Sequence, residues 1–156
     1  MPATLKPEIV EIGGLTFFNQ DIEADPPASW VAFKSKIKAA DAVLFVTPEY
    51  NRSVPAVLKN VIDVASRPVG KSAWSGKPAA VITATPGALG GFGANHHLRQ
   101  SLAGLNVPTM GYPETYLGGI DKLLTPEGGF ANPSTPEFLR KFMHAFEKWV
   151  AANVPP

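Results

Sequence analysis

Apolar and polar residues follow one another along the chain in short blocks that predict strands. Residues 42–47 (AVLFVT) and 79–84 (AAVITA) are apolar without alternation, which is typical of strands covered on both faces in a parallel sheet. We expect the first of these to be a central strand. Residues 8–12 (EIVEI) form a shorter β-branched run that ends at a Gly-Gly pair, which favours another strand before a turn. A short strand is also expected near residues 109–116.

Between and after these strands, apolar residues recur at the spacing of one helix face. Ser29 offers an N-cap after an acidic loop, Pro55 can occupy a first helical position, and residues 67–68 (Arg-Pro) end that second helix. Further helices are expected over about 95–105 and after Ser134. The positions expected to face the core are Trp30, Phe33, Ile37 and Ala40 in the first helix, Leu58, Val61, Ile62 and Ala65 in the second, and Phe138, Phe142, Phe146, Trp149 and Val150 in the last.

Strands that alternate with helices predict an α/β sandwich whose parallel strands are joined by right-handed crossovers. The chain has 156 residues, of which 45% are hydrophobic and 17% are charged, and this matches an ordinary globular domain. We therefore expect a single domain over residues 1–156.

Charge and cysteine content exclude several classes of function. Fourteen Lys and Arg against thirteen Asp and Glu leave a net charge of +1, so the chain has no global basic field to attract nucleic acid or anionic lipid. The absence of cysteine excludes disulfide scaffolds, thiolate zinc sites and cysteine nucleophiles. The first residues do not resemble a signal peptide, and no apolar run approaches the roughly 18 residues that span a bilayer. We expect a soluble, cytoplasmic protein.

Two segments follow the two most apolar strands and are the places to look for chemistry, since doubly wound sheets bind ligands beyond the carboxyl ends of their strands. The first, residues 47–53, reads TPEYNRS. In it, Tyr50 can stack on a planar ligand, and Asn51 and Ser53 can donate hydrogen bonds to anionic or carbonyl oxygens. Asn51 and Ser53 can equally serve as turn and N-cap residues of the next helix.

The second segment, residues 84–93, reads ATPGALGGFG. We expect Gly87, Gly90 and Gly91 to allow positive φ and a close approach of the backbone, which leaves N–H groups free to point at a ligand. Neither segment is a Walker loop, because the GK[ST] ending is missing.

Three strings make the chain resemble the NADPH-dependent FMN reductases, a family with a flavodoxin-like fold that includes chromate, quinone and azo-dye reductases. They are VTPEYNRSVPAVLKNVIDVASRP at 46–68, GKPAAVITATPGALGG at 76–91 and HHLRQSL at 96–102. The first string is the specific part, because a glycine-rich loop alone is a weak signal. The resemblance implies a flavodoxin-like three-layer sandwich, FMN as cofactor and NAD(P)H as co-substrate. The electron acceptor would be a quinone, chromate, an azo compound or free flavin.

The resemblance also implies which residues meet the flavin. In such enzymes the PEYN segment lines the isoalloxazine or its ribityl chain, and the glycine-rich loop lies near the pyrimidine edge of the ring. Hydride transfer needs no protein acid, so no catalytic residue is expected, and we interpret Glu49 as a positioning residue. The expected cofactor-binding residues are Pro48, Glu49, Tyr50, Asn51, Ser53, Thr85, Gly87, Gly90 and Gly91.

The start of the chain departs from the family. Members begin with a strand, a phosphate-binding loop of the form G-S-x-R-x-x-S-x-N and a helix, and the sequence contains no such segment. A strand, loop and helix occupy about 25–30 residues. We therefore expect the first strand and helix of the fold to be missing and the flavin phosphate to lack its main binding loop. We favour a start codon placed too far downstream or a truncation; a lineage that has lost the loop is the third explanation.

Two other functions stay open at this point. One is an N-terminally truncated, non-enzymatic flavodoxin-like module that no longer binds FMN, which the missing phosphate loop favours. The other is a nucleotide-binding domain of Rossmann type, which the lack of G-x-G-x-x-G after the first strand disfavours.

Polar residues outside the two loops are expected to be structural. Adjacent histidines on a helix point about 100° apart, so His96 and His97 cannot easily face one metal, and no metal site is predicted. Arg52 is weighed for contact with the NADPH phosphate or a partner subunit, although an exposed surface arginine is the simpler interpretation. We expect Asn60 and Asp63 to tie their helix to neighbouring loops.

Loop aromatics point to a partner subunit. Family members are dimers or tetramers with flavin sites near the interface, so the resemblance implies a homodimer or homotetramer. Aromatic residues in loops can be covered by a second copy. The residues open to this interpretation are Phe17, Phe18, Trp74, Phe92 and Tyr112.

Overall fold

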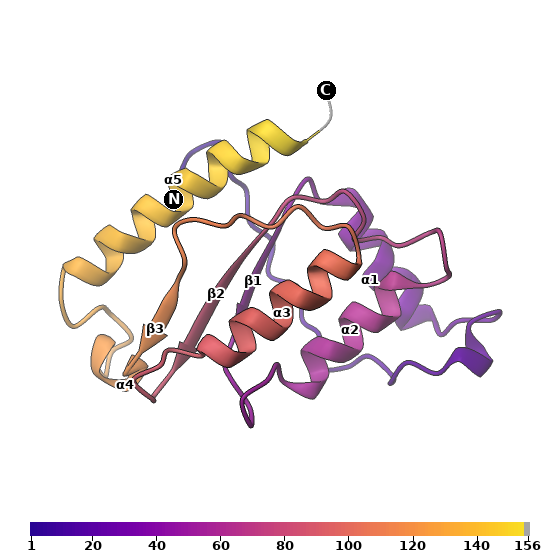
Figure 1. Cartoon of the computed structure of the whole chain (residues 1–156), viewed down its shortest axis with the longest axis horizontal. Helices are drawn as coiled ribbons and strands as arrows, with labels where there is room; N and C mark the ends of the chain where they lie inside the picture. Colours follow the sequence, from indigo (N-terminus) through magenta and orange to yellow (C-terminus); the bar gives the residue numbers. More distant parts are fainter. Residues whose placement is uncertain (155–156) are drawn as a thin grey trace.

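The computed structural model describes residues 1–154 and contains a parallel three-stranded sheet flanked by helices (Figure 1). The strands lie in the order β1-β2-β3, which is also their order along the chain. The elements are the 3-10 helix η1 (Gln20–Ile22), α1 (Ala28–Ala39), β1 (Val43–Thr47), α2 (Ala56–Ser66), β2 (Ala79–Thr85), α3 (Phe92–Gly104), β3 (Tyr116–Gly118), α4 (Ile120–Leu123) and α5 (Ser134–Asn153).

The helices form two layers around the sheet. Helices α1, α2 and α3 cover one face, and α5 covers the other (Figure 1). Side chains of β2 alternate between the layers, since Val81 packs with α1–α3 while Ala80 and Ile82 pack with Phe142 and Phe146 of α5. Full burial of a Phe side chain stabilises a fold by roughly 1.5–3 kcal/mol. The sandwich expected from the alternation of strands and helices is therefore present.

Strand β1 lies at the edge of the sheet, so the prediction that it is central was wrong. It pairs only with β2, from Val43↔Ala79 to Thr47↔Thr83. Val46 is 64% exposed, as is possible at the edge of a sheet. The central position belongs to β2, whose residues 79–83 are all buried.

The strand predicted at residues 8–12 does not form. A strand needs a neighbour for its backbone hydrogen bonds, and within residues 1–154 only β2 pairs with β1. Val10 and Ile12 instead pack as partly buried side chains against the layer of α1–α3. The apolar character of the run was interpreted correctly, but its pairing was not.

Three helix starts differ from the expected positions. Helix α1 begins at Ala28 with the extended Pro27 as its N-cap, so Ser29 lies inside the first turn and does not cap. Pro55 is the N-cap of α2 and not its first helical residue. Helix α3 begins at Phe92, earlier than expected, because Gly91 takes a left-handed conformation (φ 81°) and turns the chain directly into the helix.

The strand expected near residues 109–116 is reduced to its two ends. Thr109 forms an isolated parallel bridge with Ala79, and β3 itself covers only Tyr116–Gly118. Pro108 and Pro113 lack the N–H groups that a continuous ladder needs, which accounts for the interruption. The short helix α4 was not predicted.

Most of the predicted core residues are buried. Ala40, Trp149 and Val150 are partly buried, and Phe138 is exposed. No helix within residues 1–154 combines the length and apolar character that crossing a bilayer requires.

Two of the five loop aromatics belong to the core. Trp74 is only 2% exposed and donates its indole N–H to the carbonyl of Ile62, and Phe18 stacks on Trp30. Phe17, Phe92 and Tyr112 are exposed. The idea that a partner subunit covers Trp74 is therefore wrong.

Candidate functional site

The two predicted loops meet at the carboxyl end of the sheet. Residues 48–53 follow β1 and residues 86–91 follow β2. The first turn of α3 lies between them, since a Cβ placed on Gly93 would stand 2.8 Å from the carbonyl oxygen of Arg52. The register of the parallel strands brings the loops to this edge, as the doubly wound arrangement predicts.

The loop after β1 is a tight two-residue turn. Tyr50 and Ser53 exchange backbone hydrogen bonds of 2.9 and 3.0 Å. The two residues between them, Asn51 and Arg52, both have positive φ (50° and 67°), as in the primed turns that connect hairpin strands. The turn leaves the ring of Tyr50 61% exposed at the rim of the sheet.

The carboxylate of Glu49 points inward from this turn and not toward solvent. Its Oε2 accepts a 2.9 Å hydrogen bond from the backbone N–H of Ala94, in the first turn of α3. Its Oε1 accepts a 3.2 Å hydrogen bond from Nη1 of Arg52. The N-terminus of a helix favours a negative charge, so this placement stabilises both groups.

The glycine-rich loop after β2 is held close to its neighbours. Gly90 and Gly91 have positive φ (59° and 81°), and a Cβ on Gly91 would lie 2.8 Å from Cβ of Thr83. Gly87 does not have positive φ, so that part of the prediction was wrong. Gly87 instead lies in open space, where only Oγ1 of Thr85 would come within 4 Å of an added Cβ. Its surroundings leave room for a ligand beside the backbone.

The two histidines of α3 contact different partners. Nδ1 of His97 lies 3.0 Å from Oγ of Ser53, and Nε2 of His96 lies 3.2 Å from the hydroxyl of Tyr116. Burial, followed by the neighbouring carboxylate of Glu114, raises the pKa of Tyr116 above its ordinary value. Tyr116 therefore stays protonated at neutral pH.

Two helix residues singled out in the sequence have different roles. Asn60 is buried, and its side chain bonds to Phe18 N–H and to the carbonyls of Leu15 and Thr16, so it ties α2 to a loop as predicted. Asp63 pairs with Lys59 of its own helix, and its predicted link to a loop is not present.

The donor groups at this edge fit a planar ligand with carbonyl groups and a hydroxylated chain. Tyr50 supplies an exposed aromatic face, and residues 86–89 present exposed backbone beside the hydroxyl of Thr85. Hydroxyl and amide side chains of Ser53 and Asn51 lie in the turn opposite. All nine residues expected at the cofactor lie in or beside these two loops.

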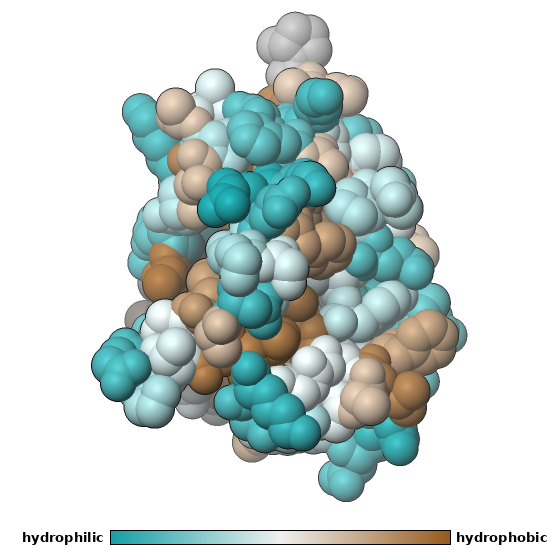
Figure 2. All heavy atoms as spheres, turned by 90° about the vertical axis from the view of Figure 1, so that its left-hand side faces the viewer, coloured by the Kyte–Doolittle hydropathy of each residue, from teal (hydrophilic) through white to brown (hydrophobic). Residues whose placement is uncertain are grey.

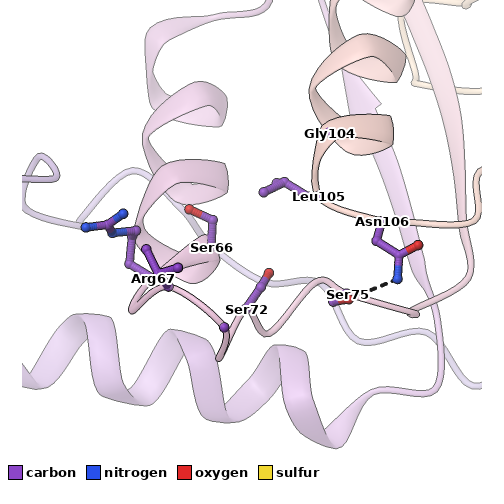
Figure 3. A pocket seen from close by; sticks show the side chains of 9 residues that line it. Ser66, Arg67, Ser72, Ser75, Gly104, Leu105 and Asn106 are labelled. Atoms are coloured by element: carbon purple, nitrogen blue, oxygen red, sulfur yellow. Dashed lines mark hydrogen bonds between the residues drawn. The ribbon is translucent and has the colours of Figure 1, made fainter.

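The depressions in the surface lie elsewhere or only touch this edge. One of about 440 Å³ lies at the opposite ends of α2 and α3, where Ser66, Ser75 and Asn106 line it (Figure 3). A groove of about 960 Å³ runs between α2 and α3 from Tyr50 to Leu105. The first is at the amino ends of the strands, where this architecture does not bind ligands, so the loop edge is the stronger candidate.

Apolar side chains also reach the surface near α4. On the side of the molecule that carries α4 and the start of α5, they are interspersed with hydrophilic ones (Figure 2). The large exposed apolar residues of this segment are Leu124, Phe130 and Phe138.

A buried polar network behind the glycine-rich loop escaped the sequence analysis. Asn95 is fully buried, donates to Oγ1 of Thr83 at 3.4 Å and accepts a 2.7 Å bond from Nε of Arg99. Arg99 also donates to the carbonyl of Met110. The sequence signal that could have indicated this network is an Asn in the first half of a helix, four residues before an Arg.

Comparison with known proteins gives one consistent family. The sequence profile described as NADPH-dependent FMN reductase matches residues 2–121. A protein named quinone reductase from Pseudomonas putida is 56% identical over 97% of this chain and 82% of its own length. A 2-hydroxy-1,4-benzoquinone reductase from Burkholderia is 42% identical over 96% of this chain and 81% of its own length.

Solved structures agree with the fold. The flavoenzyme NAD(P)H:(acceptor) oxidoreductase FerB from Paracoccus denitrificans is similar with a TM-score of 0.85 and 40% identity, over 91% of this chain and 78% of that one. An oxidoreductase from Corynebacterium diphtheriae, 17% identical, shares the fold with a TM-score of 0.62 over 84% of this chain and 65% of that one.

Proposed function

Because the chain belongs to the NADPH-dependent FMN reductase family, we propose that it is an NAD(P)H-dependent quinone reductase that uses FMN. The observation that carries this is the meeting of the PEYN turn and the glycine-rich loop at the first turn of α3, where Gly93 allows contact with Arg52. A quinone is the favoured acceptor among those expected, because the two relatives from Pseudomonas putida and Burkholderia compared above are named quinone reductases.

We assign the two loops to different parts of the cofactor. Tyr50 offers its exposed ring to the flat isoalloxazine, and Asn51 and Ser53 offer polar groups to its edge or side chain. Thr85 and the backbone beside Gly87 would hold the pyrimidine edge of the ring. Bound FMN supplies hydride acceptance from NAD(P)H and electron transfer to the quinone. The protein supplies binding and orientation, and no side chain is assigned as acid or base.

Binding of FMN to the 156-residue protein is the first test of this function. Titration of FMN with protein, followed by flavin fluorescence, should give saturable quenching and a perturbed visible absorption band. Riboflavin, which lacks the phosphate, is the matched ligand. Equal affinity for FMN and riboflavin would mean that the protein makes no stabilising contact with the phosphate. No quenching at all would favour the non-enzymatic module, which keeps the fold without the cofactor.

We also infer that the protein forms a homodimer or homotetramer. Phe92 and Leu89 expose apolar side chains beside the glycine-rich loop, and the groove between α2 and α3 begins at the same edge. Light scattering coupled to size exclusion should give two or four times 16.6 kDa. A monomer at micromolar concentration would contradict this inference.

The whole chain is proposed to fold as one domain. The two clusters of core residues share β2, since Val81 belongs to one and Ile82 to the other. Calorimetric unfolding should therefore show a single cooperative transition.

A further inference from the structure

We propose that Glu49 is a positioning residue that fastens the PEYN turn to the glycine-rich loop by capping α3, and that it does so without touching the cofactor. This inference rests on the proposed function, because the two loops it joins are those assigned to FMN. It gives the positioning role expected for Glu49 a definite partner, and it removes Glu49 from the residues expected along the flavin.

The cap comes from a residue far away in the sequence. The first N–H groups of a helix have no partner within the helix, and the residue before it normally supplies a side-chain acceptor. The N-cap of α3 is Gly91, which has no side chain and makes no such bond. Glu49, 45 residues earlier, supplies the acceptor to Ala94 at 2.9 Å.

The carboxylate is enclosed as well as bonded. The Glu49 side chain is only 9% exposed, whereas that of its ion-pair partner Arg52 is 74% exposed. One oxygen is occupied by the Ala94 N–H and the other by Arg52. A side chain so engaged is turned toward α3 and is not free to reach a ligand at the rim.

Gly93 provides independent support for this arrangement. It lies in the first turn of α3 without positive φ, so the helix itself gives no reason for a glycine there. Gly is less favourable than Ala in a helix. A Cβ at Gly93 would stand 2.8 Å from the carbonyl oxygen of Arg52 and 3.0 Å from Oε2 of Glu49. The missing side chain is what lets the turn approach the helix.

A second contact fixes the same two elements. Oγ of Ser53 lies 3.0 Å from Nδ1 of His97, one helical turn beyond Ala94. The turn between Glu49 and Ser53 contains two residues in left-handed conformations, Asn51 and Arg52, which such contacts hold in place. Loops held in their binding geometry before the ligand arrives lose less conformational freedom on binding, which strengthens affinity.

The test compares Glu49→Ala with Glu49→Gln and uses two readouts. Glutamine keeps an oxygen that can accept the Ala94 N–H, and alanine does not. In the ligand-free protein, the Ala94 amide should exchange its hydrogen at least tenfold faster in Glu49→Ala and near the wild-type rate in Glu49→Gln. The Kd for FMN should rise about tenfold in Glu49→Ala and less than threefold in Glu49→Gln.

Gly93→Ala tests the same contact in another way. Its added Cβ should push the PEYN turn away from α3 while the Glu49 side chain is unchanged. It should also raise the Kd for FMN. Glu137→Ala, which removes an exposed carboxylate paired with Lys141 on α5, is the control and should change neither readout.

Three outcomes would overturn the proposal. They are an unchanged Ala94 exchange rate in Glu49→Ala, fast exchange with an unchanged Kd for FMN, and a loss of FMN affinity in Glu49→Gln as large as in Glu49→Ala. The last would assign Glu49 to direct contact through its charge. Wild-type protein that binds no FMN would instead overturn the proposed function, and the exchange rates would still decide whether Glu49 holds the turn to α3.

Discussion

Gly90 approaches Tyr116 so closely that a Cβ on Gly90 would lie 2.6 Å from the carbonyl carbon of Tyr116. The glycine-rich loop thus rests directly on the backbone of β3. Gly90 also has φ of 59°, which side chains rarely adopt. We expect Gly90→Ala to destabilise the fold by about 2–4 kcal/mol, from the strained conformation together with the overlap.

Denaturant unfolding measures this effect, and Gly13→Ala is its matched control. Gly13 has no heavy atom within 4 Å of an added Cβ, so its substitution should change the free energy of unfolding by less than about 0.5 kcal/mol. Equal effects of the two substitutions would show that the loop does not rest on β3.

Asn60 ties α2 to the segment before α1. Replacement of Asn60 by Ala leaves the partly buried N–H of Phe18 without its acceptor, which should lower the free energy of unfolding by about 1–3 kcal/mol. The Kd for FMN should not change, because Asn60 lies away from the loop edge. Asp63→Asn, which affects only an exposed pair with Lys59, serves as the comparison and should stay within about 0.5 kcal/mol.

Tyr50 should matter for binding and not for stability. Its exposed ring contributes little to the core, so Tyr50→Ala should leave the melting temperature nearly unchanged while raising the Kd for FMN about two- to tenfold. Tyr50→Phe keeps the ring and should bind as the wild type does. Tyr112→Ala removes another exposed tyrosine, in the segment before β3, and should have no effect on affinity. Unaltered FMN binding by Tyr50→Ala would remove that residue from the site.

The pKa of Tyr116 should lie above the ordinary value of a tyrosine. Burial and the nearby Glu114 raise its pKa above the ordinary 10.0. The unfolded chain loses this proton at lower pH than the folded protein does. The associated stability is therefore complete below pH 10 and is lost as the pH rises through the pKa of the folded state. Absorbance titration at alkaline pH should show an ionisation step above the ordinary pKa of 10.0 that Tyr116→Phe abolishes. If Tyr116→Phe instead abolishes a step at the ordinary tyrosine pKa of 10.0, the raised pKa is contradicted.

The sequence predicted those parts of the fold that depend on hydrophobic patterning within one segment. The unbroken apolar run at 79–84 marked the buried strand β2, and the spacing of Leu58, Val61 and Ile62 marked the buried face of α2. The placement of the candidate loops followed from the rule that ligands bind beyond the carboxyl ends of parallel strands.

Features that depend on distant partners could not be predicted in this way. Residues 8–12 have the composition of a strand, but a strand also needs a neighbour, and local sequence does not contain that information. Glu49 in its motif gave no sign that its carboxylate caps a helix 45 residues later. Gly93 was given no role of its own within the segment 84–93, because its contact with Arg52 exists only in three dimensions.

Quinone-dependent oxidation of NADPH by the protein with added FMN, under anaerobic conditions, tests the central claim most directly. The rate of NADPH oxidation should rise with the concentration of 1,4-benzoquinone and saturate with the concentration of FMN. It should exceed the rate measured with the same FMN concentration and no protein. The same assay with NADH in place of NADPH identifies the preferred hydride donor. Oxidation no faster than that by free FMN, with a protein that shows a cooperative unfolding transition, would contradict the assignment as a quinone reductase.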